Sequence, residues 1–354
     1  MNDPVRLLEL GAISWLRTQA VYHALAELMT EETPDTLILA RTEEPYVCVG
    51  YHQSLNAVLD EAACRFAGLP IVRRRVGGGT TYLDKNQPFY QCIFHHKHLP
   101  YRVDAVYARL LDAPVTVLRN LGLPAGIRDG NEIEVDGRRI AGVGGGRIGE
   151  AVVVVGNILL DFDYKVMAHL WRVPSEEFRR LAYKAMQSRI TTVWGQLEQP
   201  ISAGEIQAHL ADAYALTLNR PLRHGTLSEV EQAKVAEMEK QLVSAEWLHL
   251  HAQDSDEPMR KLKISLDAFV HAEEAQLHGT IINGTFFVRN GVIEQAIITG
   301  DLSAKKKHLV ENRLVGVLFK RWCEVVEPLV LIPVEEFDHR SGVKPFNGVD
   351  QLTL

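Results

Sequence analysis

The sequence predicts an α+β protein of two domains. Its 354 residues are more than a single hydrophobic core usually spans, so two domains are expected. Short apolar runs between turn residues alternate with longer segments in which apolar residues recur at helical spacing. A polar connection then changes the character of the chain. We therefore predict a large domain at residues 1–248, a linker at 249–260 and a small α+β domain at 261–354.

The composition excludes several classes of protein. Hydrophobic residues make up 46% of the chain and charged residues 23%, which is typical of a soluble globular protein. A net charge of -7 argues against a nucleic-acid partner. The absence of a long apolar run argues against a membrane-spanning protein. Cys48, Cys64, Cys92 and Cys323 form no Cys-x-x-Cys pair, which disfavours a zinc site or a disulfide framework. A cytoplasmic location is therefore expected.

The elements of the first domain follow from apolar periodicity and turn residues. Asp136-Gly137 is a favoured two-residue hairpin turn, and Ser202 is a suitable helix N-cap. Expected helices are residues 12–31, 59–69, 103–121 and 202–218, and expected strands are 35–41, 46–50, 89–94, 131–135 and 151–161, the last with a bulge at Gly156.

The second domain has a similar alternation of elements. Asn290-Gly291 indicates a hairpin turn between two strands. A helix with a basic start at residues 305–307 follows, and that charge run is typical of a solvated face. Expected strands are residues 262–266, 280–288 and 292–299, and the expected helix is 302–322.

Residues 73–84 have the composition of a binding loop, because three arginines run into three glycines. Consecutive glycines allow positive φ and a close approach of backbone N–H groups to a ligand. Guanidinium groups suit phosphate or carboxylate. A second glycine segment, residues 144–146, lies beside Arg147 and is expected to form another loop of the same anion pocket. A glycine-rich turn with a solvated basic flank is the alternative.

His95, His96 and His98 invite a metal interpretation. They have no nearby Asp or Glu, and Cys92 is expected as a core residue of the preceding strand, so a polar loop is favoured over a metal site.

The order of these motifs resembles the lipoate-protein ligase family, within the biotin/lipoate ligase superfamily. That family has two arginines, two further residues, three glycines and a later acid, as at residues 73–84. The resemblance covers nearly the whole chain. It extends through residues 47–53, 131–142 with Arg147, 156–160, 188–191 and 287–301.

The resemblance implies a fold and an activity. The fold is a large mixed β-sheet catalytic domain of the biotin/lipoate ligase type with flanking helices, followed by a small accessory domain. Such enzymes use ATP and Mg2+ to convert lipoate into lipoyl-AMP. They then transfer the lipoyl group to a lysine of a lipoyl carrier domain, of the glycine cleavage H protein or 2-oxoacid dehydrogenase E2 type.

The resemblance also assigns roles to residues. Arg139 would be catalytic, and Glu132, beside Asn131, would bind magnesium. The expected substrate and adenylate contacts are Arg73, Arg74, Val76, Gly77, Gly78, Gly79, Gly50, Gln53, Tyr82, Asp84, Asn131, Ile133, Ala141, Gly142, Arg147 and Asn157.

Four positions depart from the family pattern. Arg139 stands where the family carries its catalytic lysine, and Arg138 beside it could compete for the role. The other departures replace a serine by Val76 and two histidines by Leu83 and Asn157. An arginine keeps the charge but has a wider, planar fork.

Two alternatives therefore stay open. One is an octanoyl or lipoyl transferase of the same superfold, which needs no ATP. The other is a non-catalytic protein that binds lipoyl-AMP or a lipoyl domain. Biotin-protein ligase is disfavoured, since its Gly-Arg-Gly-Arg loop is absent.

Overall fold

A computed structural model describes residues 3–252 and 257–331, and it confirms the α+β class. The chain divides into two compact units, Met1–Val270 and His271–Leu354. Residues 253–256 of the expected linker and residues 332–354 of the expected second domain lie outside the described residues. The first unit continues beyond the expected linker to Val270, so residues 261–270 belong to it.

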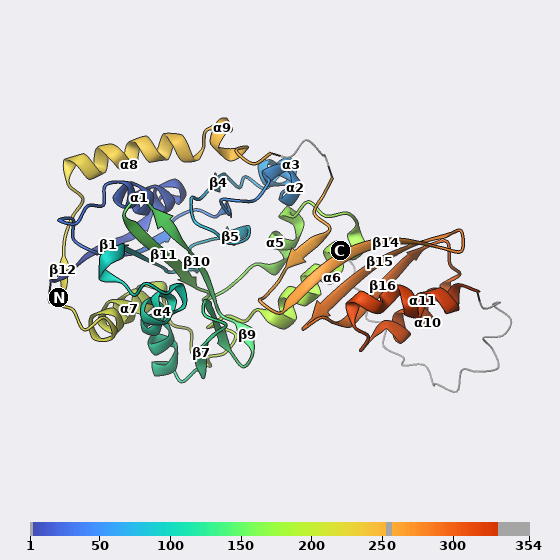
Figure 1. Ribbon diagram of the computed structural model, residues 1–354. Helices are drawn as coiled ribbons and strands as arrows, with labels where there is room; N and C mark the ends of the chain where they lie inside the picture. Colours follow the sequence, from blue (N-terminus) through green and yellow to red (C-terminus); the bar gives the residue numbers. More distant parts are fainter. Residues whose placement is uncertain (1–2, 253–256, 332–354) are drawn as a thin grey trace. The chain divides into compact units, whose positions relative to one another are not determined.

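A six-stranded mixed sheet is the centre of the first unit (Figure 1). Its antiparallel part contains β10, β11, β6 and β2, whereas β2, β1 and β12 run parallel. In spatial order the strands are β10 (Ala141–Ile148), β11 (Ala151–Ile158), β6 (Phe89–His95), β2 (Thr36–Thr42), β1 (Val5–Ile13) and β12 (Leu222–His224).

Helices cover both faces of this sheet, because alternate side chains of a buried strand point to opposite faces. In β2, Leu37 and Leu39 pack in one hydrophobic cluster, and Ile38 and Ala40 pack in the other. On the first face lie α4 (Val103–Asn120) and α7 (Ala203–Thr217), and on the second lie α1 (Trp15–Glu27) and α8 (Glu229–Leu242). The capping box of Ser202 starts α7, as predicted.

Two small sheets carry the loops that the sequence singled out. One contains β4 (Ile71–Arg73), β3 (Tyr46–Val49) and β5 (Thr81–Leu83), and the other β7 (Ala125–Arg128), β8 (Glu132–Val135) and β9 (Arg138–Arg139). The remaining helices of the unit are α2 (Leu55–Val58), α3 (Glu61–Phe66), η1 (His96–His98), α5 (Tyr164–Leu170), α6 (Glu176–Arg189) and α9 (Ala245–Leu248).

Several predicted elements differ from the structure. The predicted helix at 12–31 begins only at Trp15, because the preceding residues form the unpredicted strand β1. The helix predicted at 59–69 is present as α3 but is shorter, from Glu61 to Phe66. The predicted bulge at Gly156 is also wrong, as this residue pairs in register with Tyr90 and Val143. A Cβ on Gly156 would lie 2.2 Å from the Tyr90 hydroxyl, so the glycine accommodates the neighbouring ring.

The second unit is small and α+β, as predicted. Strand β14 (Ala268–Leu277) enters it from the first unit, after the short β13 (Lys261–Lys263). It continues with β15 (Thr280–Arg289), β16 (Val292–Gly300), α10 (Ala304–Leu314), η2 (Phe319–Arg321) and α11 (Trp322–Leu331). Phe286, Val310 and Trp322 join strand and helices in one cluster. The helix predicted at 302–322 ends early, before Gly316, which has a φ of 86°.

Among the described residues, no helix combines the length and the apolar character needed to cross a lipid bilayer.

Candidate functional site

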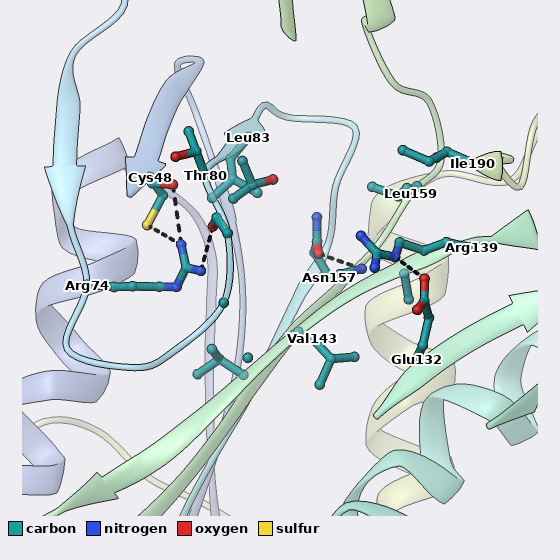
Figure 2. A pocket seen from close by; sticks show the side chains of 18 of the residues that line it. Cys48, Arg74, Thr80, Leu83, Glu132, Arg139, Val143, Asn157, Leu159 and Ile190 are labelled. Atoms are coloured by element: carbon teal, nitrogen blue, oxygen red, sulfur yellow. Dashed lines mark hydrogen bonds and ion pairs between the residues drawn. The ribbon is translucent and has the colours of Figure 1, made fainter. Parts of the chain in front are cut away.

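The first unit contains a cavity of about 280 Å³ between the small sheets and one end of the large sheet. Arg74 enters it from one side and Arg139 from the other, with Asn157 and Val143 between them (Figure 2). Half of the eighteen predicted site residues line this cavity. They are Arg74, Gly78, Gly79, Asn131, Glu132, Arg139, Ala141, Gly142 and Asn157.

The fit of the glycine loop depends on Gly78 and on Gly50 beside the loop. Gly78 has a φ of +110°, a conformation that L residues rarely adopt. The loop also lies against the end of β3, where a Cβ on Gly50 would stand 1.9 Å from the carbonyl oxygen of Gly78. Gln53 fixes this contact, since its Oε1 accepts hydrogen bonds from Gly50 N and Thr80 Oγ1, both at 3.0 Å. Gly50 and Gln53 therefore build the loop without lining the cavity.

Arg74 holds the loop from inside. Its Nη2 donates to the carbonyl oxygens of Gly79 at 2.7 Å and Gly77 at 3.1 Å. Its Nη1 donates to the carbonyl oxygen of Cys48 at 3.3 Å and lies 3.4 Å from the Sγ of that residue. The guanidinium lines the cavity, but most of its donors are already used by the loop.

The structure gives Arg73 a different place from the expected substrate contact. Its side chain is fully buried, and it does not line the cavity. Nη1 donates to the carbonyl oxygens of Gly50, Tyr51 and Gln53 at 2.7–3.0 Å, while Nε and Nη2 donate to residues 247 and 248. Because these acceptors satisfy the guanidinium, Arg73 anchors the backbone around the loop.

The second glycine segment is not a loop, contrary to the prediction. Residues 144–146 lie within β10 and pair with β11 in continuous register. Their lack of side chains lets the first loop approach, with Gly77 N donating to Gly145 O at 3.3 Å. Arg147 lies beyond the cavity lining, where Nε donates to Gly149 O and Nη2 pairs with Glu150 at 3.6 Å. The cavity therefore has one glycine loop and one glycine-rich strand, instead of two glycine loops.

The hairpin of β8 and β9 places Arg139 at the cavity. Asp136 and Gly137 have φ values of 49° and 69°, as the predicted tight turn requires. Opposite Arg139, the buried Glu132 accepts a hydrogen bond from its Nε at 2.5 Å. Within the described residues, neither Nη of Arg139 has a protein partner. One edge of the guanidinium is therefore held while the other is available to a ligand.

Glu132 does not fit the expected magnesium role. Oε1 accepts from Arg139, and Oε2 accepts from the backbone N–H of Leu266 at 2.9 Å. A metal ion would have to displace a cation from one oxygen or a backbone donor from the other. The geometry instead makes Glu132 the residue that positions Arg139.

Asn157 is likewise committed to the protein. Its Oδ1 accepts from Gly142 N at 3.0 Å, and its Nδ2 donates to Gln87 Oε1 at 2.5 Å. A Cβ on Gly142 would lie 2.3 Å from Asn157 Oδ1, so the pair requires glycine. The asparagine joins β10 to β11 at the cavity wall.

The apolar wall comes mostly from residues that the sequence did not single out. The strands contribute Val143, Val155 and Leu159, as the valine-rich run suggested. Helix α5 and the residue after it add Met167 and Trp171, helix α6 and the residue after it add Met186 and Ile190, and the turn after β13 adds Ile264 and Leu266. The helical residues resemble an ordinary buried helix face in the sequence, so their periodicity carries no sign of the cavity.

The other predicted contacts lie outside the lining. Val76 and Ile133 are core residues. Burial raises the pKa of the Tyr82 hydroxyl to about 12, while Asp84 accepts from Asn86 N at 2.9 Å and closes a turn. Gly77 stands behind Gly78 against β10.

Comparison with known proteins identifies the family. A family profile described as the lipoyl protein ligase A/B catalytic domain matches residues 16–215. The chain belongs to this family. It is 26% identical over 255 residues to the octanoyltransferase LipM of Symbiobacterium thermophilum, and the alignment covers 66% of this chain and 93% of that protein.

Solved lipoate-protein ligases share the fold. The chain aligns with a structure from a study of a bipartite lipoate protein ligase and its E2 lipoyl domain from Thermoplasma acidophilum, at a TM-score of 0.65 and 22% identity. The match covers 72% of this chain and 99% of the Thermoplasma chain. A lipoate-protein ligase A bound with ATP aligns at a TM-score of 0.60 and 21% identity, and the alignment covers 71% of this chain and 100% of that ligase. The predicted family and fold are confirmed.

One relative is named as an octanoyltransferase, and a cysteine thiol could accept an acyl group in such a transfer. The positions of the cysteines are therefore relevant. Among the described residues, Cys48 is the one cysteine that lines the cavity. Burial raises the pKa of Cys92 to about 12 and that of Cys64 to about 11, which favours the protonated thiol in both. Cys92 lies against the Tyr214 hydroxyl at 3.5 Å, away from the cavity.

The histidine cluster acquires acidic partners that the sequence did not reveal. Glu150 approaches His95 Nε2 at 3.7 Å and His96 Nδ1 at 3.2 Å, and Asp35 contacts His98 at 3.0 Å. However, His95 Nδ1 accepts from Lys97 N at 3.3 Å, which places the proton of the neutral ring on Nε2. That tautomer has no free electron pair toward Glu150, so the geometry disfavours a metal there.

Proposed function

We propose that this chain is a lipoate-protein ligase, which activates lipoate with ATP and transfers it to a lysine of a lipoyl domain. One observation carries the proposal. A single cavity joins a glycine loop, a guanidinium with two available Nη groups and an apolar wall. These are the environments that a phosphate, an acyl carbonyl and an apolar tail need.

In the first step, a carboxylate oxygen of lipoate attacks the α-phosphorus of ATP. A carboxylate O–P bond forms, the P–O bond to pyrophosphate breaks, and pyrophosphate leaves with that electron pair. The N–H groups around Gly78 would stabilise the anionic phosphate, and the open edge of Arg139 would bind the lipoate carboxylate that becomes the acyl group. ATP is bound in the structure of one relative of the same fold, which supports this assignment.

In the second step, the neutral amine of the carrier lysine attacks the acyl carbonyl carbon. The C–N bond forms, the C–O bond to AMP breaks, AMP leaves with the electron pair, and the amine releases its proton. Arg139 is the residue we assign to the acyl carbonyl and the bridging oxygen, and Glu132 orients it. Met167, Trp171 and Met186 would exclude water from the reactive anhydride.

Lipoyl domains of the E2 type, or the glycine cleavage H protein, are the carriers we propose. Support for the E2 type comes from the Thermoplasma ligase of the same fold, which was studied together with its E2 lipoyl domain.

Octanoyl transfer without ATP is the second candidate, since the LipM relative is named as an octanoyltransferase. An acyl thioester on Cys48 would be its covalent intermediate, because that thiol lines the cavity. The Cys48 thiolate would attack the thioester carbonyl of octanoyl carrier protein, and the thiolate of that protein would leave. The neutral amine of the carrier lysine would then attack the acyl-Cys48 carbonyl, and the Cys48 thiolate would leave as the amine releases its proton.

One experiment separates these functions. The purified protein is incubated with an apo lipoyl domain and either lipoate, ATP and magnesium, or octanoyl carrier protein alone, and the domain is weighed by mass spectrometry. We expect lipoylation in the first mixture. Modification in the second mixture alone would replace the ligase by the transferase, and modification in neither would indicate a non-catalytic binding protein.

A further inference from the structure

Four charged side chains line the cavity within the described part of the chain: Arg74, Glu132, Arg139 and Lys263. Three are cations and one is an anion, so the lining has a positive excess. Lys263 is exposed, so it stands where the cavity meets solvent. A site with positive excess favours an anionic ligand. The sequence assigned three of these residues to the site, but Lys263 was expected in the accessory domain.

The three cations differ in how far the protein already uses them. Arg74 donates to three backbone carbonyls of the glycine loop and β3. Arg139 is paired with the only lining carboxylate among the described residues. Lys263 has neither a hydrogen-bond nor an ion-pair partner among the described residues. Its ammonium is therefore the cation most available to a ligand.

The segment that carries Lys263 is fixed to the rest of the site. Ile264 N donates to Ala268 O at 2.9 Å, which closes a tight turn after β13. Within that turn, the backbone N–H of Leu266 donates to Glu132 Oε2 at 2.9 Å. Glu132 thus holds Arg139 with one oxygen and the turn after Lys263 with the other.

Ion pairs secure the same turn. Asp267 contacts Arg128 at 3.1 Å and Arg189 at 3.4 Å, so it joins the turn to β7 and α6. Burial alone would raise the pKa of Asp267, but hydrogen bonds from Ser265 and Arg128 lower it to about 2. The carboxylate is ionised at neutral pH, and the turn keeps its position.

A lysine offers what Arg139 lacks. An ammonium is a compact charge with three donors on a flexible stem, whereas a guanidinium held at Nε presents a fixed planar edge. An acyl-adenylate carries one negative charge, on its phosphate. Arg139 can serve the acyl carbonyl while a second cation serves this phosphate.

We propose that Lys263 donates to a phosphate oxygen of the bound acyl-adenylate and so supplies the ammonium that the hairpin does not carry. The assignment rests on the proposed acyl-adenylate function. Lys263 would stabilise charge on the phosphate as pyrophosphate leaves and again as AMP leaves.

The test measures binding of lipoyl-sulfamoyladenosine, a stable and negatively charged analogue of lipoyl-AMP, by isothermal titration calorimetry on the full chain. Lys263→Met should raise the Kd at least about tenfold, as expected for the loss of a charge-assisted hydrogen bond. Lys263→Arg should recover part of the affinity. Lys261→Met is the matched control, since Lys261 lies on the same strand over the Phe269 ring and does not line the cavity. Its Kd should stay within about twofold of the wild type.

Lipoamide, which has the same tail without a charge, distinguishes charge from packing. Its affinity should be the same for the wild type and Lys263→Met. Equal losses for lipoamide and the charged analogue would mean that the substitution disturbs the wall, and would overturn the assignment. An unchanged Kd for the charged analogue in Lys263→Met would overturn the role of Lys263 and leave the ligase function standing. No binding of the analogue by the wild type would overturn the ligase function, and with it this inference.

Discussion

The glycine loop and the β8–β9 hairpin both bring arginine to the cavity, but they use it in opposite ways. In the loop, Arg73 and Arg74 direct their donors to backbone carbonyls. In the hairpin, Arg139 is held at Nε by Glu132 and keeps both Nη groups available within the described structure. Adjacent arginines in a sequence can therefore fix the backbone of a site through their own hydrogen bonds, while a single arginine held at one nitrogen keeps donors for a ligand.

The largest expected effect concerns Arg73, whose role is structural in this comparison. Arg73→Ala would leave several buried backbone carbonyls without donors, and should lower the free energy of unfolding by about 3–5 kcal/mol. Urea unfolding measures this. The exposed Arg147→Ala should change it by less than about 0.5 kcal/mol. Similar stability of the two variants would mean that Arg73 is not the anchor of the loop.

The next prediction tests whether the shape of the loop matters to the ligand. Gly50→Ala would push a Cβ against Gly78 O, which an intact backbone cannot accommodate. Because displacements near 1 Å can cost about a hundredfold in activity, kcat/KM for lipoyl transfer should fall by about that factor. Gly126→Ala, with open space around its Cβ, is the control in a steady-state assay. Normal transfer by Gly50→Ala would show that the loop tolerates displacement.

The buried His23, which is hydrogen-bonded to the start of the glycine loop, should make the stability of the protein depend on pH. Its Nε2 accepts from Arg75 N at 2.8 Å, and burial lowers the pKa of this histidine from 6.5 to about 3. Between these values the unfolded chain binds a proton that the folded chain does not, so stability falls as pH drops below 6.5. From pH 6.5 to 5 the loss attributable to His23 should be about 2 kcal/mol.

Unfolding by urea at several pH values checks this prediction, with His23→Gln as the comparison. The variant should be less stable at pH 7, but its stability should fall less steeply with acid. Parallel pH profiles for the two proteins would exclude His23 as the cause.

The smallest expected effect is at Arg139. In Arg139→Lys, one ammonium nitrogen would be shared between Glu132 and the acyl carbonyl, whereas the guanidinium of Arg139 offers each of them a separate nitrogen. We expect kcat for lipoyl-AMP formation to fall about tenfold, with unfolding little changed. Pyrophosphate release measures the step. An increase in kcat would instead show that the native arginine limits activation, and that holding Arg139 at Nε does not serve the chemistry.

Much of the local structure could be predicted because its signals are local. The hairpin turn at Asp136-Gly137 and the cap at Ser202 depend on residues close in sequence. The strand β1 escaped prediction, and residues 144–146 were predicted as a loop although they form part of β10. In both cases pairing with a distant strand outweighs local preference.

The sequence by itself determined the family, the fold class and the segments around the cavity. Only the tertiary structure decided which side chains face it. Arg73 and Arg74 are neighbours, yet one is buried among carbonyls and the other lines the cavity. Lys263 lies near the C-terminal end of the first unit in sequence, and it is placed at the cavity by a turn that is hydrogen-bonded to Glu132. Motifs record residue order, whereas contact with a ligand depends on where distant segments pack and on which donors the backbone has already taken.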